Sequence, residues 1–112
     1  GEMAGLAFEH LYEEEIVVVA REGHPQASHP VADLLQTVPL ILPPEGALIR
    51  RAVNDYLASL GLPALRPAFE TVALAVGRGI LAGSDAVWFI SRGVVAEEVD
   101  RGELIVLPTG AR

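Results

Sequence analysis

The chain has 112 residues, of which 51% are hydrophobic and 21% are charged, and its 15 acidic against 8 basic side chains give a formal net charge of −7. This length favours a single domain, and the hydrophobic share is ample for a packed core, which excludes a disordered chain. Cysteine is absent, so disulfides, thiol catalysis and cysteine–zinc sites are excluded. The acidic balance argues against direct binding of nucleic acid by this segment, because phosphates require clustered positive charge.

The apolar runs are short. One of the longest, residues 38–42, falls far below the roughly 20 residues that a membrane-spanning helix needs. The start of the sequence does not show the pattern of a secretory signal, in which a charged segment, an apolar segment and a cleavage site follow one another. We therefore expect no membrane partner and a cytoplasmic location.

The first segments are predicted to be strands. Residues 6–12 alternate loosely between apolar and polar side chains, which is typical of a strand whose two faces differ. Residues 16–20 form a β-branched run that is apolar on both faces, which indicates a buried strand. A polar loop follows this second strand.

A short helix and another strand come next. Pro30 fits the first position of a helix over 31–36, because its missing N–H would be unpaired there in any case. Residues 38–42 are again apolar throughout and predict a second buried strand. Pro43 and Pro44 close it, since proline cannot donate to a strand ladder.

The clearest helix is predicted over 47–60. Apolar side chains recur there at three- and four-residue spacing and share one face: Ile49, Ala52, Val53, Tyr56, Leu57 and Leu60. Gly61 can adopt the left-handed conformation that ends a helix. Residues 66–70 predict the next strand.

A further helix is predicted over 71–82, with Thr71 as its N-cap. Its expected buried face consists of Val72, Ala75, Val76, Gly79 and Ile80. Gly77 and Gly79 each weaken a helix by about 1 kcal/mol relative to alanine. We therefore expect this helix to pack closely on a sheet.

The last third predicts a strand over 85–90, a helix over 94–101 and a strand over 103–107. Strands that alternate with helices indicate right-handed βαβ units. The predicted fold class is therefore α/β, a three-layer α-β-α arrangement around an open, mainly parallel sheet.

This topology predicts where a ligand binds. In a parallel sheet the carboxyl ends of the strands lie at one edge, where the following helices begin. The junctions at 43–47, 70–71 and 90–93 should therefore meet, and their helix N-termini offer unpaired N–H groups to an anion such as a carboxylate. The alternative is that these loops only turn the chain.

Short motifs also follow one another along the chain in a specific order. They are Ile16-Val17-Val18-Val19-Ala20-Arg21 leading to Gly23-His24-Pro25, Pro39-Leu40-Ile41-Leu42-Pro43, Arg50, Gly61-Leu62, Glu70-Thr71-Val72, Ser84-Asp85-Ala86-Val87-Trp88-Phe89-Ile90, and Gly102-Glu103-Leu104-Ile105-Val106-Leu107-Pro108. In order and spacing they resemble the effector-binding domain of LysR-type transcriptional regulators over nearly the whole chain. Within this family the chain is similar to regulators of protocatechuate catabolism (the PcaQ type) and to galactose-binding-protein regulators.

The resemblance implies a type 2 periplasmic-binding-protein-like fold made of two lobes. It implies that residues 1–112 are one truncated effector-binding domain, with the second lobe at about 20–89 and flanking pieces of the first lobe at 4–16 and 93–108. The implied hinge residues are Ala20, Arg21, His24 and Ile90.

The resemblance also implies a function. The chain would bind a small carboxylated metabolite, such as one from aromatic catabolism, between the lobes and thereby control transcription. DNA would be contacted only through a helix-turn-helix domain that this sequence lacks. We expect a homo-oligomer, a tetramer for the full-length protein and a dimer for this chain, and no enzymatic activity.

The candidate effector-binding residues lie at the strand-to-helix junctions: Glu45, Gly46, Ala47, Arg50, Glu70, Thr71, Val72, Phe89, Ile90 and Ser91. Arg50 could bind an effector carboxylate with its guanidinium fork, or be a surface arginine or part of an intersubunit salt bridge. Glu70 could face the cleft or cap helix N–H groups.

Two alternatives remain open, a small α/β enzyme fragment that uses Glu70 with a histidine and an extracytoplasmic solute-binding lobe. No cofactor and no metal are expected. The glycines at 77, 79 and 83 lie inside a predicted helix rather than opening one after a strand, which argues against a nucleotide cofactor.

Overall fold

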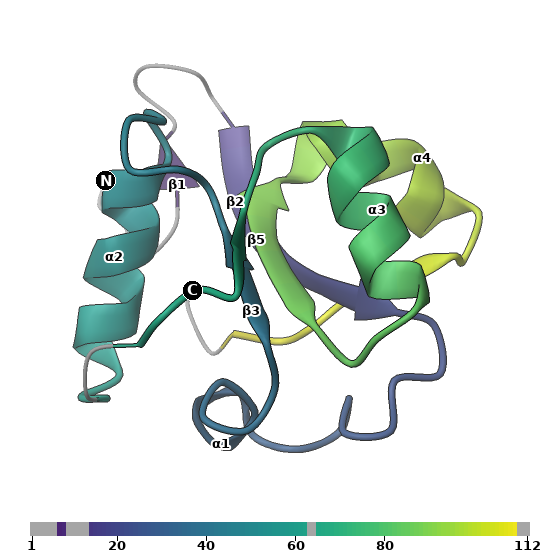
Figure 1. The fold of residues 1–112 in the computed structure, drawn as a ribbon, viewed down its shortest axis with the longest axis horizontal. Helices are drawn as coiled ribbons and strands as arrows, with labels where there is room; N and C mark the ends of the chain where they lie inside the picture. The colour runs from purple at the N-terminus through teal and green to yellow at the C-terminus, as the bar shows by residue number, and fades with distance from the viewer. Residues whose placement is uncertain (1–6, 9–13, 63–64, 110–112) are drawn as a thin grey trace.

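The computed structural model describes residues 7–8, 14–62 and 65–109 (Figure 1). The elements in chain order are β1 (Ala7–Phe8), β2 (Glu14–Arg21), α1 (Val31–Leu34), β3 (Leu40–Leu42), α2 (Arg50–Ser59), β4 (Phe69–Glu70), α3 (Leu74–Ala82), β5 (Val87–Ser91), α4 (Arg92–Asp100) and β6 (Leu104–Val106). Residues 6 and 9–12 of the first predicted strand lie outside the described residues. The α/β fold class is confirmed.

The strands form one sheet in the order β1-β2-β5-β3-β4, with β6 also paired to β2. The predicted parallel arrangement holds for β3, β4 and β5. The expectation of a mainly parallel sheet needs correction, because β2 runs antiparallel to β1, β5 and β6. The sheet is therefore mixed, and its parallel part carries the strand-to-helix junctions.

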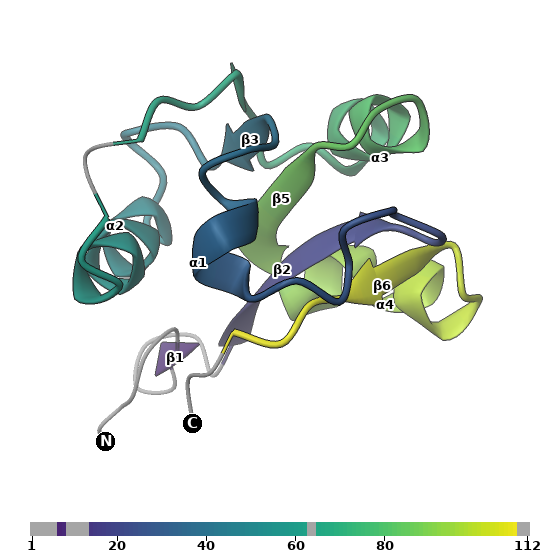
Figure 2. The same ribbon diagram turned by 90° about the horizontal axis from the view of Figure 1, so that it is seen from below.

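Helices cover both faces of this sheet (Figures 1 and 2): α2 lies on one face and α3 and α4 lie on the other. The neighbours Trp88 and Phe89 on β5 point to these opposite faces. Phe89 meets Tyr56 of α2 with ring centroids 6.0 Å apart, while Trp88 packs against Gly77 of α3. Both aromatic side chains are fully buried, so β5 is the centre of a three-layer core.

The predicted face of α2 is largely confirmed. Ile49, Ala52, Val53 and Tyr56 are buried, and Gly61 ends the helix with a φ of 71°. The helix itself begins at Arg50, after a turn in which the Arg50 amide donates to the Ala47 carbonyl. Pro30 occupies the N-cap of α1 rather than its first helical position.

The prediction for α3 was wrong at its start. The helix begins at Leu74 with Ala73 as N-cap, and the Thr71 hydroxyl accepts a hydrogen bond from the Ala73 amide at 3.0 Å. Thr71 cannot cap the helix because its own amide continues the β4 ladder to the Leu42 carbonyl at 3.0 Å, and its carbonyl accepts from the Trp88 indole at 3.1 Å.

The predicted buried face of α3 was wrong at four of its five residues, whereas the fifth, Ile80, is partly buried against the core. Val72 and Val76 are 45% and 51% exposed, and Ala75 and Gly79 are exposed as well. The buried residues of α3 are instead Gly77 and Leu81. Gly77 lies against the Trp88 ring, where a Cβ would come within 2.4 Å. The helix is thereby rotated from the orientation that its apolar pattern predicts.

The proposed division into lobes stays a prediction. In the structure β6 joins the same sheet as β3 and β5 through β2. Residues 4–6 and 9–13 of the first flank lie outside the described residues. No helix in the described ranges is both long and apolar enough to cross a bilayer.

Candidate functional site

Three strand-to-helix junctions meet at one cavity of about 280 Å³. It is lined by Ala47, Leu48, Ile49, Val72, Ile90, Ser91 and Val94. The first three residues precede α2, Val72 lies between β4 and α3, and the last three lie where β5 passes into α4. The cavity therefore brings together four of the predicted site residues: Ala47, Val72, Ile90 and Ser91.

The lining is apolar except at Ser91. This residue is 5% exposed and forms the N-cap of α4, with φ −64° and ψ 136°, yet its side chain makes no capping hydrogen bond. Within the described residues its hydroxyl makes no hydrogen bond and is accessible to solvent, since the buried side-chain atom without a partner there is Glu98 Oε1. The first-turn N–H groups of α4 and the positive end of its dipole lie beside it. This corner of the cavity can hold an anionic oxygen, while the remaining walls contact an apolar body.

Arg50 lies beside this cavity in a cluster of its own. It is 6% exposed, so the alternative of a surface arginine is wrong. Its Nε donates to Asn54 Oδ1 at 2.9 Å, and one terminal nitrogen donates to the Pro43 carbonyl at 2.7 Å and to Glu70 Oε2 at 3.1 Å. The other terminal nitrogen reaches Glu45 Oε2 at 3.3 Å. The guanidinium fork is thus engaged within the chain.

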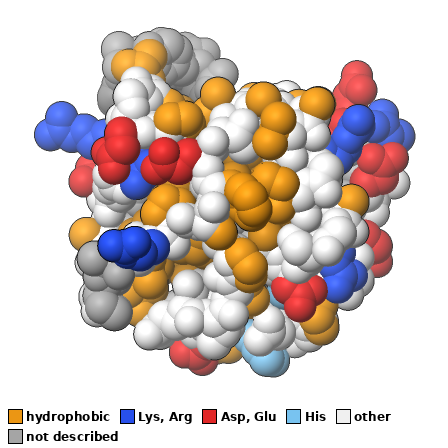
Figure 3. Space-filling model, in the orientation of Figure 1, with side chains coloured by type: hydrophobic (Ala, Val, Ile, Leu, Met, Phe, Trp, Pro, Cys, Tyr) orange, Lys and Arg blue, Asp and Glu red, His pale blue; other side chains and the backbone are white. Residues whose placement is uncertain are grey.

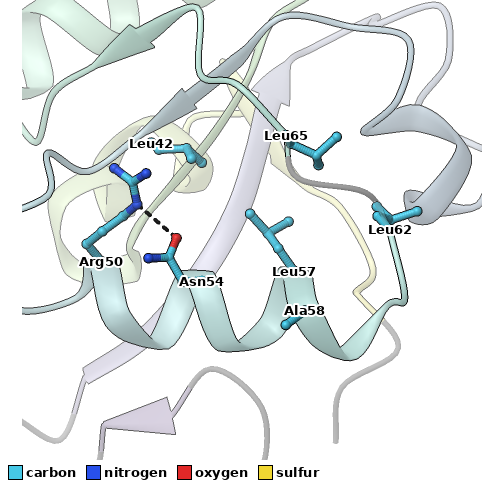
Figure 4. Close-up of a pocket in the computed structure, with 7 residues that line it drawn as sticks. All are labelled: Leu42, Arg50, Asn54, Leu57, Ala58, Leu62 and Leu65. Atoms are coloured by element: carbon cyan, nitrogen blue, oxygen red, sulfur yellow. Dashed lines mark hydrogen bonds between the residues drawn. The ribbon is translucent and has the colours of Figure 1, made fainter.

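A second cavity of about 250 Å³ lies on the α2 side of Arg50 (Figure 4). Its walls are leucine side chains with Ala58, and its polar residues are Arg50 and Asn54, which are joined by the Nε–Oδ1 hydrogen bond. Leu57, on the predicted apolar face of α2, lines this cavity and is also partly buried against the core. Sequence periodicity did not indicate the cavity, since a cavity wall and a core contact have the same apolar pattern.

Two of the predicted hinge residues, Ala20 and Arg21, end β2, and a third, Ile90, lies on β5. Ala20 is buried opposite Ile105. Arg21 donates to the Ser84 carbonyl at 3.0 Å and pairs with Asp85 at 2.9 Å. Ile90 is 1% exposed and lines the apolar cavity. The hinge role of these residues stays a prediction.

His24, the fourth hinge candidate, is 4% exposed. Its Nδ1 accepts from the Gln26 amide at 3.0 Å, so its Nε2, 2.7 Å from the Asp85 carbonyl oxygen, is the donor there. These contacts assign the imidazole a neutral tautomer with the proton on Nε2. His24 therefore joins the loop after β2 to the start of β5.

The remaining candidates are not on the cavity. Phe89 is fully buried in the core, Glu45 and Gly46 are exposed in the loop before α2, and Thr71 lies in the extended segment before α3. Glu70 binds Arg50 and caps no helix by its side chain. Leu48, Ile49 and Val94 were missed as site residues. Leu48 and Val94 lie one residue beyond the predicted junctions at 43–47 and 90–93, and Ile49 was assigned to the apolar face of α2. Across residues 7–8, 14–62 and 65–109, no three His, Asp or Glu side chains are grouped as metal ligands.

Comparison with known proteins identifies the family of the chain. A family model described as the LysR substrate binding domain matches residues 1–112. The chain is 45% identical over 108 residues to the HTH-type transcriptional regulator PcaQ of Agrobacterium fabrum, covering 95% of the chain and 35% of PcaQ. It is 38% identical over 104 residues to the regulator GalR of Pseudomonas putida, covering 92% of the chain and 26% of GalR. The chain thus spans about a third or less of the length of these relatives.

Solved structures show the same fold. The regulatory domain of CcmR from Synechocystis PCC6803, in complex with 2-PG, superposes with a TM-score of 0.67 at 25% identity, over 84% of this chain and 46% of that one. The regulatory domain of the HypT M206Q mutant from Salmonella typhimurium gives a TM-score of 0.65 at 15% identity, over 87% and 46%. Both match only part of a regulatory domain.

Proposed function

The chain belongs to the family of LysR substrate-binding domains, and on this premise we propose that it senses a small carboxylate for a transcriptional regulator. The relatives with which it shares 45% and 38% identity are named as transcriptional regulators, which are not enzymes. Sensing requires differential affinity of the effector for two states of the protein and no chemical step. The apolar cavity with Ser91 at its end is suited to such binding.

The observation that carries the choice of a carboxylate is Ser91 at the N-terminus of α4, a residue that is 5% exposed and whose solvent-accessible hydroxyl makes no capping hydrogen bond. A carboxylate there would accept from this hydroxyl and from the first-turn amides of α4. Leu48, Val72 and Val94 leave an apolar space for the rest of the molecule. An acid with a compact apolar body, such as an aromatic acid, fits these requirements, and the similarity to PcaQ supports that class.

The other properties of the whole protein are proposals of the same kind. We propose that DNA is bound by a helix-turn-helix portion outside this chain, as the names of its relatives suggest, and that the regulator works in the cytoplasm. We also propose a homo-oligomer. Its support is the edge strand β4, which pairs only with β3 within the described residues. Phe69 on β4 is 49% exposed, and Figure 3 shows hydrophobic side chains gathered in the middle of the visible face.

The enzyme alternative has less support. It requires Glu70 to act with a histidine, but Glu70 is paired with Arg50, and the described residues contain no hydrogen bond between Glu70 and a histidine. The solute-binding alternative shares the fold and would require an export signal in the full-length gene. Neither has a specific observation in its favour.

The test is an NMR titration of the chain with benzoate, and with benzyl alcohol as an uncharged molecule of similar size. We expect benzoate to shift the amides of residues 91–94 with an affinity near 1 mM, about −4 kcal/mol, because one lobe buries only part of a ligand. Ser91→Ala should weaken benzoate binding severalfold, whereas Ser28→Ala, at an exposed loop position, should not. Equal binding of benzyl alcohol, or no shift at residues 91–94, would show that the carboxylate assignment is wrong.

A further inference from the structure

The two sides of the apolar cavity belong to segments that are far apart in sequence. Beside the β5–α4 junction, two walls come from loops: residues 47–49 between β3 and α2, and Val72 after β4. Neither wall lies within a helix or a strand. The pairing of β3 with β4 and the hydrogen bond from the Thr71 amide to the Leu42 carbonyl join the bases of the two loops. Side-chain contacts join the loops further along.

Arg50 makes these contacts. Its guanidinium binds the Pro43 carbonyl at 2.7 Å and Glu45 at 3.3 Å, both in the loop that leads to the first wall. The same group binds Glu70 at 3.1 Å, two residues before Val72. Its Nε is fixed by Asn54, one turn later on α2, at 2.9 Å. One buried side chain thus joins the loop after β3, the end of β4 and the first turn of α2.

We infer that Arg50 is a positioning residue for the effector cavity, which it shapes by holding residues 47–49 and Val72 at a set distance without touching the effector. This inference rests on the proposed function of the cavity. It differs from the role of a carboxylate-binding fork, since Arg50 does not line this cavity. Ligand sites require such support because small displacements of their walls weaken binding.

The charges of the cluster favour this role over direct binding. Glu45 and Glu70 together carry two negative charges against the single positive charge of Arg50. An effector carboxylate would have to displace one of them from the guanidinium. The two contacts are not equivalent, since the Glu45 side chain is 78% exposed and that of Glu70 is 39% exposed. Water screens the Glu45 contact more strongly, so Glu70 is the more important partner.

The test compares Arg50→Lys, which keeps the charge and loses the planar fork, with Arg51→Lys, the same change at the next residue, which is exposed. Glu70→Gln is a milder second variant that keeps an acceptor and removes the ionic contact. Each variant is titrated with benzoate at a temperature at which thermal unfolding shows it fully folded. The side-chain methyl resonances of Leu48 and Val72 are followed in the free protein.

We expect Arg50→Lys to weaken benzoate binding about tenfold and to shift both methyl resonances, with a smaller change in the same direction for Glu70→Gln and none for Arg51→Lys. A purely structural role would lower the unfolding temperature and leave the affinity of the folded protein unchanged, which would overturn the inference. If the unaltered chain does not bind benzoate, the proposed effector class fails. In that case unchanged methyl resonances in Arg50→Lys would overturn the positioning role, and shifted ones would support it.

Discussion

Gly77 on α3 lies against the Trp88 indole on β5, so closely that a Cβ at position 77 would lie 2.4 Å from the ring. The same indole donates to the Thr71 carbonyl at 3.1 Å. Trp88 therefore fixes both the start of α3 and the extended segment that precedes it. Val72, a wall of the effector cavity, lies within that segment. The contact between Gly77 and Trp88 thus connects core packing with the shape of the site.

Gly77→Ala should destabilise the chain. Alanine favours a helix by about 1 kcal/mol over glycine, but forcing a side chain into filled space costs about 1–3 kcal/mol and more where the backbone must move. Because no real Cβ fits at 2.4 Å, we expect a net loss of about 2 kcal/mol in the free energy of unfolding, measured by urea denaturation.

Gly79→Ala is the matched control on the same helix. Nothing lies within 4 Å of a Cβ at position 79, so only the helix propensity acts there. We expect a gain of about 0.5–1 kcal/mol. If both alanine variants changed the stability alike, the close approach of α3 to Trp88 would not be what determines its position.

The central strands and α2 could be predicted because their signals are local. Residues 16–20 and 87–90 are apolar on both faces and are buried on both faces. Ile49, Ala52, Val53 and Tyr56 repeat at helical spacing and face the core. In each case the apolar residues of one element are the ones that the fold buries, so the prediction needed no knowledge of the neighbouring elements.

The orientation of α3 could not be predicted in this way. Its residues are apolar or small around most of the helix, so several faces are equally suited to burial. The choice is made by Trp88, which lies on a different element and accepts only Gly77 against its ring. In the site, too, the features that depend on contacts between elements could not be predicted. Topology predicted Ala47, Val72 and Ser91 at one cavity, but the partners of Arg50 come from the loop after β3, from β4 and from α2, and this combination could not be deduced.

His24→Ala should destabilise the loop between β2 and α1. The substitution leaves the Asp85 carbonyl and the Gln26 amide without the partners that lie at 2.7 Å and 3.0 Å. Unsatisfied polar groups of this kind cost about 1–3 kcal/mol. We expect a loss of that size in urea denaturation, with a negligible change for His29→Ala, since His29 is exposed. Equal effects of the two substitutions would contradict the structural role of His24.

Tyr56 should make stability depend on pH under alkaline conditions. Burial raises the pKa of Tyr56 above its ordinary value, and its interaction with Thr109 opposes this in part. The folded state therefore binds the phenolic proton more tightly than the unfolded state does. The resulting stability is fully present below about pH 10, the ordinary pKa of tyrosine, and is lost as the pH rises through the higher pKa of the folded state.

Tyr56→Phe tests this dependence. The variant loses the hydrogen bond from the Tyr56 hydroxyl to the Thr109 carbonyl at 2.7 Å, so we expect it to be about 1 kcal/mol less stable at pH 8. Its stability should then fall less steeply than that of the unaltered chain above pH 10. Parallel curves for the two proteins across this range would exclude Tyr56 as the source of the alkaline loss.

Phe69→Glu should weaken self-association. β4 is the last strand of the described sheet order, and Phe69 on it is 49% exposed, so both an unpaired strand edge and an apolar side chain are available to a second copy. A glutamate there would place like charges together across a symmetric interface. We expect sedimentation equilibrium to show a dimer for the unaltered chain and a monomer for Phe69→Glu. Ala58→Glu, at an exposed position on α2, should remain dimeric. A monomeric unaltered chain, or a dimer that survives Phe69→Glu, would mean that subunits do not associate through β4.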